Sequence, residues 1–281
     1  DAGVHNVLEK DYKIDSMPKT REGVDLALAD ITRHPVREYL RSLIWDGEKR
    51  CETLFIDYLG AEDSRYTRTV TRKALIGAAA RILSPGCKHD HMLVLIGPQG
   101  CRKSTTLKKL GKEWFSDSLY TMSGKDAYEQ LQGFWIIELS EMAATRKAEV
   151  EQIKQFVSKQ EDNYRAAYAR RTQCHPRQCA FFGTTNDEEF LRDPTGARRF
   201  WPVVVTDAGK TLGDKLTASI VDQIWAEAVT YYEAGETWYL DGAVEEMARK
   251  VQADHTEANG KLGLIENFLE VLLPEGWDDW D

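Results

Sequence analysis

The chain has 281 residues, of which 42% are hydrophobic and 30% charged, and its formal net charge is −9. This composition is typical of a soluble globular protein, and no run of about 18 apolar residues exists that could cross a membrane. The acidic balance excludes a protein that binds nucleic acid over its whole surface, although it is compatible with a local basic patch.

The first 88 residues are expected to be mainly helical. Apolar residues recur at helical spacing over 24–31 and 72–83, a pattern that favours amphipathic helices. A further helix is expected to begin at His34-Pro35, and Ser84-Pro85-Gly86 then breaks the chain. We assign residues 1–88 to a helical N-terminal region.

The middle of the chain, residues 89–206, alternates between short apolar runs and helical patterns. The expected strands lie at 92–96, 134–137, 179–183 and 200–205. The expected helices between the earlier strands lie at 105–110 and 148–157. Such alternation indicates an α/β fold with a central parallel sheet.

Residues 207–281 return to a helical pattern, most clearly at 220–232 and 243–254. We expect this C-terminal region to be truncated and the chain to be part of a longer polypeptide. No signal peptide is visible, which favours a cytoplasmic protein.

The five cysteines are expected to be reduced thiols, because their number is odd and no secretory signal accompanies them. They are Cys51, Cys87, Cys101, Cys174 and Cys179. Cysteine and histidine occur together in two local clusters, one around Cys87 and one around Cys174. Neither cluster has paired C-x-x-C spacing, so buried thiols are favoured over a zinc site.

A phosphate-binding loop follows the first expected strand of the middle region. Gly97, Lys103 and Ser104 have the spacing of the G-x-x-x-x-G-K-[ST] motif. Backbone N–H groups of such a loop face the phosphates, the lysine reaches the β and γ phosphates, and the serine hydroxyl ligates Mg²⁺. The sequence therefore predicts ATP and Mg²⁺ as cofactors. The predicted nucleotide-binding residues are Gly97, Pro98, Gln99, Gly100, Cys101, Arg102, Lys103, Ser104 and Thr105.

Arg102 occupies the position before the lysine, where the motif has glycine. A side chain at this position can restrict the backbone and crowd the phosphates, or its charge can hold them. An ordinary strand-to-helix turn without nucleotide is the alternative to the whole motif. Nucleotide binding is favoured over that alternative, and full hydrolytic competence is left open by Arg102.

Polar residues end two later strands. Glu138 follows the apolar run 134–137, and Glu141 comes one short turn later. A carboxylate beside a phosphate loop can bind the magnesium shell or polarise the attacking water, so Glu138 is predicted as an Mg²⁺ ligand and both as catalytic. Asn186 ends the strand near 180–183 and is predicted to contact the γ-phosphate or the water. An acidic helix start and a turn-forming asparagine are the alternatives.

The order of these motifs closely resembles the virulence-associated E family, which is similar to the superfamily 3 helicases of phages, prophages and pathogenicity islands. The resemblance covers roughly residues 40 to 240. The motifs that carry it are Gly-Pro-Gln-Gly-x-x-Lys-Ser-Thr at 97–105, Trp-Ile-Ile-Glu-Leu-Ser-Glu at 135–141, Gly-Thr-Thr-Asn at 183–186, and Asp-Pro-Thr-Gly-x-Arg-Arg-Phe-Trp-Pro at 193–202.

This resemblance implies an AAA+-like P-loop ATPase core at residues 89–206 and a homo-oligomer, a hexameric ring with ATP sites between subunits and DNA in the central channel. Arg198 and Arg199 match the family's paired arginines, and Arg192 is a third candidate. An arginine supplied across a subunit boundary stabilises charge on the transferring phosphoryl group. A solvated basic turn is the alternative for each of them.

The resemblance also implies that the segment between Glu141 and Asn186 contacts DNA. Basic residues outnumber acidic ones there: Lys159, Arg165, Arg170, Arg171 and Arg177 against Glu161 and Asp162. Tyr164 and Tyr168 are interleaved with them. Basic groups follow the phosphate backbone and aromatic rings stack on bases, so single-stranded DNA is the predicted partner. A solvated helical face is the alternative.

Three functions are compatible with these motifs. The leading hypothesis is an ATP-dependent DNA helicase or translocase that serves the replication of a phage or related mobile element in the cytoplasm of its bacterial host. The second is a DNA-binding or interference module that binds nucleotide and hydrolyses it weakly because of Arg102. A small-molecule kinase is disfavoured by the acidic strand, the asparagine and the paired arginines.

Overall fold

The computed structural model describes residues 2–30, 33–140, 147–165, 171–191 and 197–256. The chain divides into two compact units, Asp1–Ser42 and Leu43–Asp281. The first unit contains the helices α1 (Ala2–Tyr12), α2 (Met17–Asp30) and α3 (Pro35–Ser42). The division therefore falls at residue 42 and not at residue 88, where the sequence-based boundary was set. The reason is that the helix Arg65–Leu83 contacts two strands of the second unit's sheet, and the helix Leu54–Leu59 contacts other helices of the same unit.

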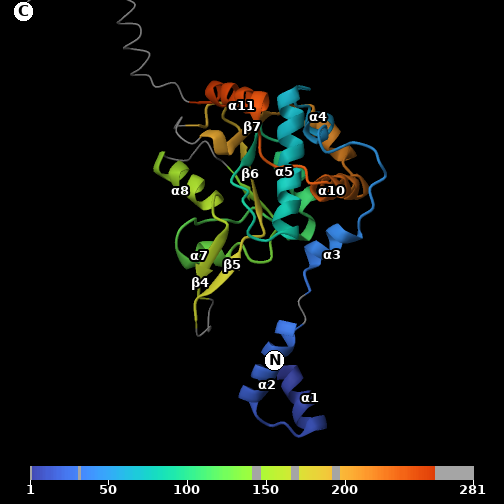
Figure 1. Ribbon diagram of the computed structural model, residues 1–281, viewed down its shortest axis with the longest axis vertical. Helices are drawn as coiled ribbons and strands as arrows, with labels where there is room; N and C mark the ends of the chain where they lie inside the picture. Colours follow the sequence, from blue (N-terminus) through green and yellow to red (C-terminus); the bar gives the residue numbers. More distant parts are fainter. Residues whose placement is uncertain (1, 31–32, 141–146, 166–170, 192–196, 257–281) are drawn as a thin grey trace, which may run out of the picture. The chain divides into compact units, whose positions relative to one another are not determined.

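Among the described residues, five parallel strands form the sheet of the second unit (Figure 1). Their order is β2 (Phe115–Ser116), β3 (Ile136–Leu139), β6 (Ala180–Thr185), β1 (Met92–Ile96) and β7 (Phe200–Val204). Every residue of β1 and β6 is buried, as expected for strands covered on both faces. The predicted α/β class, with a central parallel sheet flanked by helices, is confirmed.

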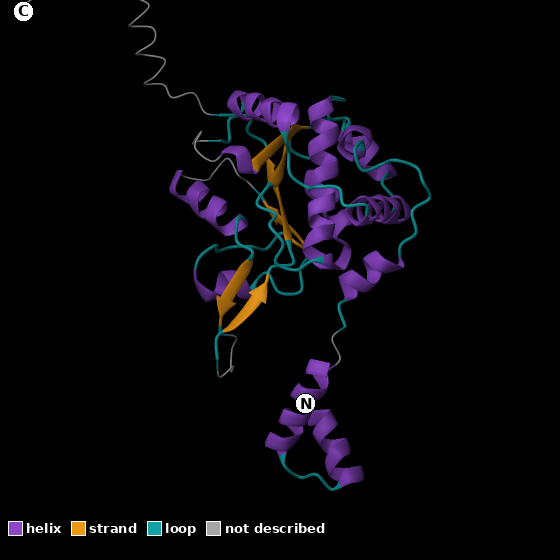
Figure 2. Cartoon of the chain, viewed as in Figure 1, coloured by secondary structure: helices purple, strands orange, loops and turns teal. Residues whose placement is uncertain are grey.

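Helices cover the sheet (Figure 2). The longest described helix is α5 (Arg65–Leu83), and it packs against α10 (Ala218–Glu233). Ser64 caps the start of α5 by accepting a hydrogen bond from the backbone of Thr67. The rings of the fully buried Trp135 and Trp225 lie 4.2 Å apart between their centroids. This contact joins the sheet to α10 and forms part of the core.

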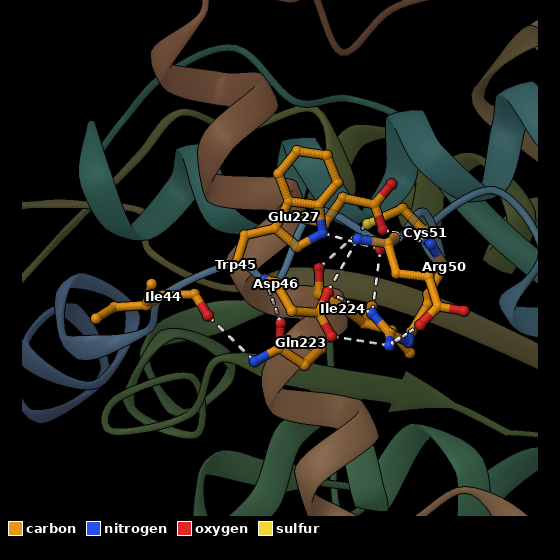
Figure 3. A network of polar contacts seen from close by, with 9 residues as sticks. Ile44, Trp45, Asp46, Arg50, Cys51, Gln223, Ile224 and Glu227 are labelled. Atoms are coloured by element: carbon orange, nitrogen blue, oxygen red, sulfur yellow. Dashed lines mark hydrogen bonds and ion pairs between the residues drawn. The ribbon is translucent and has the colours of Figure 1, made fainter.

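The segment before α4 (Leu54–Leu59) is tied to α10 by a polar network (Figure 3). The buried carboxylate of Glu227 accepts hydrogen bonds from the backbone N–H groups of Arg50, at 2.6 Å, and Cys51, at 2.8 Å. The side chain of Gln223 donates to the carbonyl of Ile44 and accepts from the backbone of Asp46. These bonds join residues 176 to 179 positions apart in the sequence and place residues 43–53 in the second unit.

A short antiparallel hairpin stands apart from the main sheet (Figure 1). It consists of β4 (Glu161–Tyr164) and β5 (Gln173–Pro176), and it follows α8 (Lys147–Val157). α7 (Gly124–Glu129) contacts β4. The sequence patterns did not predict this hairpin, nor the two-residue strand β2.

The remaining described helices are α6 (Lys103–Gly111), α9 (Gly209–Leu212) and α11 (Gly242–Asp254), together with the short helices η1 (Lys112–Trp114), η3 (Ala197–Arg199) and η4 (Gly213–Lys215). Within the described part of the chain, no helix is long and apolar enough to cross a membrane. Cys51, Cys101 and Cys179 are buried, Cys87 is half-buried and Cys174 is exposed. The described residues contain no cluster of three ligand-type side chains arranged to hold a metal ion.

Candidate functional site

The phosphate loop connects the end of β1 to the start of α6, as the sequence predicted. The ammonium group of Lys103 donates hydrogen bonds to the carbonyl oxygens of Gly97, at 2.6 Å, and Pro98, at 3.0 Å. A Cβ atom at Gly97 would lie 2.4 Å from the carbonyl oxygen of Val205. Only glycine therefore permits this close approach between the loop and the chain after β7.

Residues from three parallel strands meet at the loop, because the carboxyl ends of β1, β3 and β6 lie at one edge of the sheet. The carboxylate oxygen Oε1 of Glu138 accepts hydrogen bonds of 2.6 Å from the hydroxyl groups of Ser104 and Thr184. The amide oxygen of Asn186 accepts a hydrogen bond of 2.9 Å from Lys103. The predicted residues Lys103, Ser104, Glu138 and Asn186 thus lie together in one site.

Glu138 is 2% exposed, and its second oxygen, Oε2, has no hydrogen-bond partner among the described residues. A buried carboxylate oxygen without a partner is costly unless a ligand or an ion satisfies it. Thr184, which holds the other oxygen, was not singled out from the sequence. The hydroxyl pair Thr184-Thr185 directly before Asn186 was the available signal.

The site opens into a cavity of about 330 Å³, which is within the size range of small-molecule sites. Its walls come from the phosphate loop and from the ends of β3 and β6. The lining residues are Gln99, Gly100, Cys101, Arg102, Lys103, Ser104, Thr105, Ser140, Thr184, Thr185 and Asn186.

Arg102 adopts the left-handed backbone conformation, with φ +68°. Glycine takes this conformation without strain, which explains why the motif has glycine at this position. The Arg102 guanidinium donates to the carbonyl of Lys210 at 3.0 Å and forms an ion pair of 2.8 Å with the carboxylate of Asp214. These bonds hold the charged group to the segment after β7.

Arg198 and Arg199 lie on η3, directly before β7. Because β7 runs parallel to β1 with Phe200 beside Met92, the two arginines are at the sheet edge opposite the phosphate loop. Arg199 donates a hydrogen bond of 2.8 Å to the hydroxyl of Ser158. Both arginines line a second cavity, of about 530 Å³, together with Arg249, Gln252 and other residues of the α11 region.

The candidates for DNA contact fall into two groups. Arg165 and Arg171 are exposed at the two sides of the hairpin end. Lys159 lies over the ring of Tyr128, 4.6 Å from its centroid, and donates to its hydroxyl at 2.5 Å. Four further candidates lie outside the described residues: Glu141 of the catalytic set, Tyr168 and Arg170 of the DNA segment, and the third arginine, Arg192.

Two residues of this segment have structural roles instead of the expected surface ones. The guanidinium of Arg177 is buried and pairs with the buried carboxylate of Asp162 at 2.6 Å. The ring of Tyr164 is 7% exposed and stacks on His175 with centroids 4.3 Å apart. The sequence placed both in the segment expected to contact DNA, because it could not reveal the carboxylate that pairs with Arg177 or the ring that stacks on Tyr164.

Solved structures that resemble this chain include the apo structure of the NrS-1 C terminal region (305-718). That match has 15% identity and a TM-score of 0.43 and covers 83% of this chain and 55% of that chain. The A form apo structure of the same region matches with 14% identity and a TM-score of 0.46, covering 85% of this chain and 63% of that chain. The chain thus spans less than two thirds of the length of either structure.

None of the curated proteins matches this sequence. The family model of the virulence-associated protein E-like domain matches residues 40–257. That range contains the phosphate loop, Glu138, Asn186 and the arginine pair, in the order from which the resemblance was inferred. Since the match covers most of its length, the chain belongs to the virulence-associated protein E-like family.

Proposed function

We propose that this protein is an ATP-dependent DNA helicase or translocase that acts in the replication of a phage or related mobile element, in the cytoplasm of the bacterial host. The observation that carries the proposal is that Lys103 and Asn186 line one cavity at the carboxyl edge of the sheet. Glu138 lies directly behind its wall, bonded to the lining residues Ser104 and Thr184. Lys103, Glu138 and Asn186 supply an ammonium group, a buried carboxylate and an amide, which are the groups that phosphoryl transfer from ATP requires.

ATP and Mg²⁺ are the cofactors that fit this site. The N-terminus of α6 presents backbone N–H groups and the positive end of the helix dipole to the phosphates. The Ser104 hydroxyl and the unsatisfied Oε2 of Glu138 would hold the ion. Magnesium bound there neutralises charge on the phosphate oxygens. Lys103 would exchange its bonds to the loop carbonyls for bonds to phosphate.

Water activation is assigned to the carboxylate and the amide. Glu138 is held in place by Ser104 and Thr184, so its orientation is fixed before a nucleotide binds. Asn186, at the end of the adjacent strand, would position the attacking water or the γ-phosphate. Glu141 remains the second candidate base.

The position of the arginine pair supports a site shared between subunits. Arg198 and Arg199 lie before β7, at the opposite sheet edge from the phosphate loop of their own chain. An arginine there can reach a nucleotide only on a neighbouring copy, where it would stabilise the charge of the transferring phosphoryl group. A closed homo-oligomer, a hexameric ring, gives every site such an arginine.

DNA binding is assigned to the β4–β5 hairpin. Exposed Arg165 and Arg171 lie at the two sides of its end, and Arg170 lies between them in sequence. Clustered guanidinium groups on a projecting hairpin suit a single strand, whose phosphates are accessible along the backbone. The acidic remainder of the chain would confine the binding to this element.

The alternative, a DNA-binding module that hydrolyses nucleotide weakly, rests on the idea that Arg102 crowds the phosphates. The bonds of its guanidinium to Lys210 and Asp214 count against this idea. The motor hypothesis is therefore favoured.

Steady-state ATP hydrolysis, measured with and without single-stranded DNA, tests the proposal. Wild-type protein should hydrolyse ATP in the presence of Mg²⁺, and DNA should stimulate the rate. Lys103→Ala should abolish the activity, whereas Lys108→Ala, on the exposed face of the same helix, should retain it. Hydrolysis that is absent from the wild type under both conditions overturns the ATPase assignment, and hydrolysis that DNA does not affect overturns the motor.

A further inference from the structure

The phosphate loop is packed against the segment that follows β7. A Cβ atom at Gly209 would lie 2.4 Å from the carbonyl oxygen of Cys101, and one at Gly213 would lie 2.9 Å from the Cδ atom of Arg102. Neither glycine has a positive φ, so the close approach of the two segments, and not backbone conformation, requires them. The back of the loop therefore rests directly on residues 209–213.

Polar bonds reinforce this packing. Arg102 donates to the carbonyl of Lys210 and pairs with both carboxylate oxygens of Asp214, at 2.8 Å each. Lys109, two turns along α6, donates to the carbonyl oxygens of Gly213, at 2.8 Å, and Leu216, at 2.9 Å. The same segment thus binds both the loop and the helix that together form the phosphate site.

Arg102 also strains the loop that it anchors. A non-glycine residue in the left-handed region is strained, and this conformation persists only if other contacts hold it. The bidentate pair with Asp214 and the bond to Lys210 are such contacts. Loss of them would let residue 102 relax toward an ordinary backbone conformation and change the direction of the loop N–H groups.

We infer that Arg102 is a positioning residue, which holds the phosphate loop in its nucleotide-binding conformation through Asp214. The inference rests on the proposed function, because the ligand of the loop is the triphosphate of ATP with Mg²⁺. The apparent Kd of such a ligand rises in proportion as the competent loop conformation becomes less populated. Arg102 thus supports nucleotide binding, although a side chain at this position of the motif suggests that it crowds the phosphates.

The pair is too exposed to matter much for global stability. The side chains of Arg102 and Asp214 are 35% and 63% exposed, and exposed pairs contribute little to the free energy of unfolding. A positioning role and a merely structural role therefore predict different results. If the pair positions the loop, its loss changes nucleotide affinity in a salt-dependent way. If the pair is merely structural, its loss changes neither the affinity nor the free energy of unfolding appreciably.

The test compares Asp214→Asn with a matched control, Asp63→Asn. The control breaks the Arg68–Asp63 pair, whose side chains are 35% and 56% exposed and which is also bidentate. Binding of a fluorescent ATP analogue with Mg²⁺ is measured by titration, and thermal unfolding is measured without nucleotide. Asp214→Asn removes the ion pair with Arg102 and leaves the sequence of the phosphate loop unchanged.

Asp214→Asn should weaken binding about three- to five-fold, the range that an exposed ion pair can supply, and should unfold at the same temperature as the control. The difference from wild type should shrink at high salt, which screens the pair. Asp214→Glu, which keeps the charge, should bind nearly as well as wild type. Asp63→Asn should bind as wild type does.

Equal affinity in Asp214→Asn and Asp63→Asn overturns the inference, and so does a loss of affinity that salt leaves unchanged. If the wild type itself binds no nucleotide, that result contradicts the proposed function and, with it, the role of Arg102. The variant Arg102→Gly removes the anchor and the backbone strain together, because glycine takes the left-handed conformation without strain. Affinity that is higher in Arg102→Gly than in wild type would show that the arginine opposes binding and also overturns the inference.

Discussion

The Ser104 hydroxyl donates a 2.6 Å hydrogen bond to the carboxylate of Glu138, a residue 34 positions later in the chain. The bond joins the start of α6 to the end of β3 across the carboxyl edge of the sheet. It leaves Oε2 of Glu138 buried and without a partner among the described residues. A divalent cation would satisfy this oxygen, because magnesium prefers oxygen ligands and keeps several of its own waters.

Glu138→Gln should reduce ATP hydrolysis about 100- to 1,000-fold, the loss that follows removal of one preorganised group from such a site. The amide keeps the size of the side chain and loses the negative charge that Mg²⁺ requires. Binding of an ATP analogue should be retained, and chelation of Mg²⁺ should abolish wild-type hydrolysis. Glu113→Gln, at an exposed position on η1, is the control and should hydrolyse normally. Full hydrolysis by Glu138→Gln would contradict the assignment.

Arg198→Ala and Lys103→Ala should each be inactive, and an equimolar mixture of the two should recover part of the wild-type ATP hydrolysis. The reason is that a subunit with an intact phosphate loop can receive Arg198 from a neighbour that lacks Lys103. The comparison variant is Arg199→Ala, since Arg199 is half-buried and bonded to Ser158 whereas Arg198 is exposed. A mixture that stays inactive, from subunits that do associate, would argue against an arginine shared between copies.

Arg177→Met should lower the free energy of unfolding by about 3–5 kcal/mol, because it leaves the Asp162 carboxylate as an unpaired buried charge. The side chains of the pair are 1% and 2% exposed, and the Arg177 guanidinium also donates to the carbonyl of Phe156. Urea denaturation measures the effect. The double variant Arg177→Met/Asp162→Leu should recover most of the stability, since it removes both charges. A loss no larger than that of an exposed pair would show that Arg177 is solvated.

The free energy of unfolding should fall as pH drops below about 6.5, partly because of His89. Burial lowers the pKa of His89 well below its ordinary value, and Arg81 and His91 lower it further. The folded protein therefore keeps His89 neutral while the unfolded chain takes up the proton, so acid favours unfolding. The contribution approaches about 1.4 kcal/mol per pH unit between the two pKa values. Urea denaturation of wild type and His89→Gln from about pH 7 to about pH 5 checks it.

The slope of unfolding free energy against pH should be smaller in His89→Gln than in wild type. Other titrating groups are the same in both proteins, so the difference in slope isolates His89. The ring packs against Gly77, where a Cβ atom would lie 2.4 Å from Cε1. Some loss of stability at neutral pH is therefore expected from the substitution itself. Identical slopes in the two proteins would contradict a neutral buried histidine.

The parallel strands and the phosphate loop could be predicted from the sequence because their signals are local. An apolar run such as 92–96 and the fixed spacing from Gly97 to Ser104 depend on neighbouring residues only. The hairpin β4–β5 could not be predicted in the same way. Its burial alternates, but the buried residues include Asp162, and a carboxylate at a core position signals a strand only once Arg177 is known to pair with it.

The sequence by itself determined the family, the α/β class and the position of the predicted phosphate loop, since all three depend on motif chemistry and short-range periodicity. Only the tertiary structure decided the surroundings of three arginines whose roles the sequence left open. Arg102 is held by Asp214, Arg177 is buried with Asp162, and Arg198 lies at the far edge of the sheet. The physical reason is that a long charged side chain takes its role from its partners, and these are set by strand register and by contacts between distant segments.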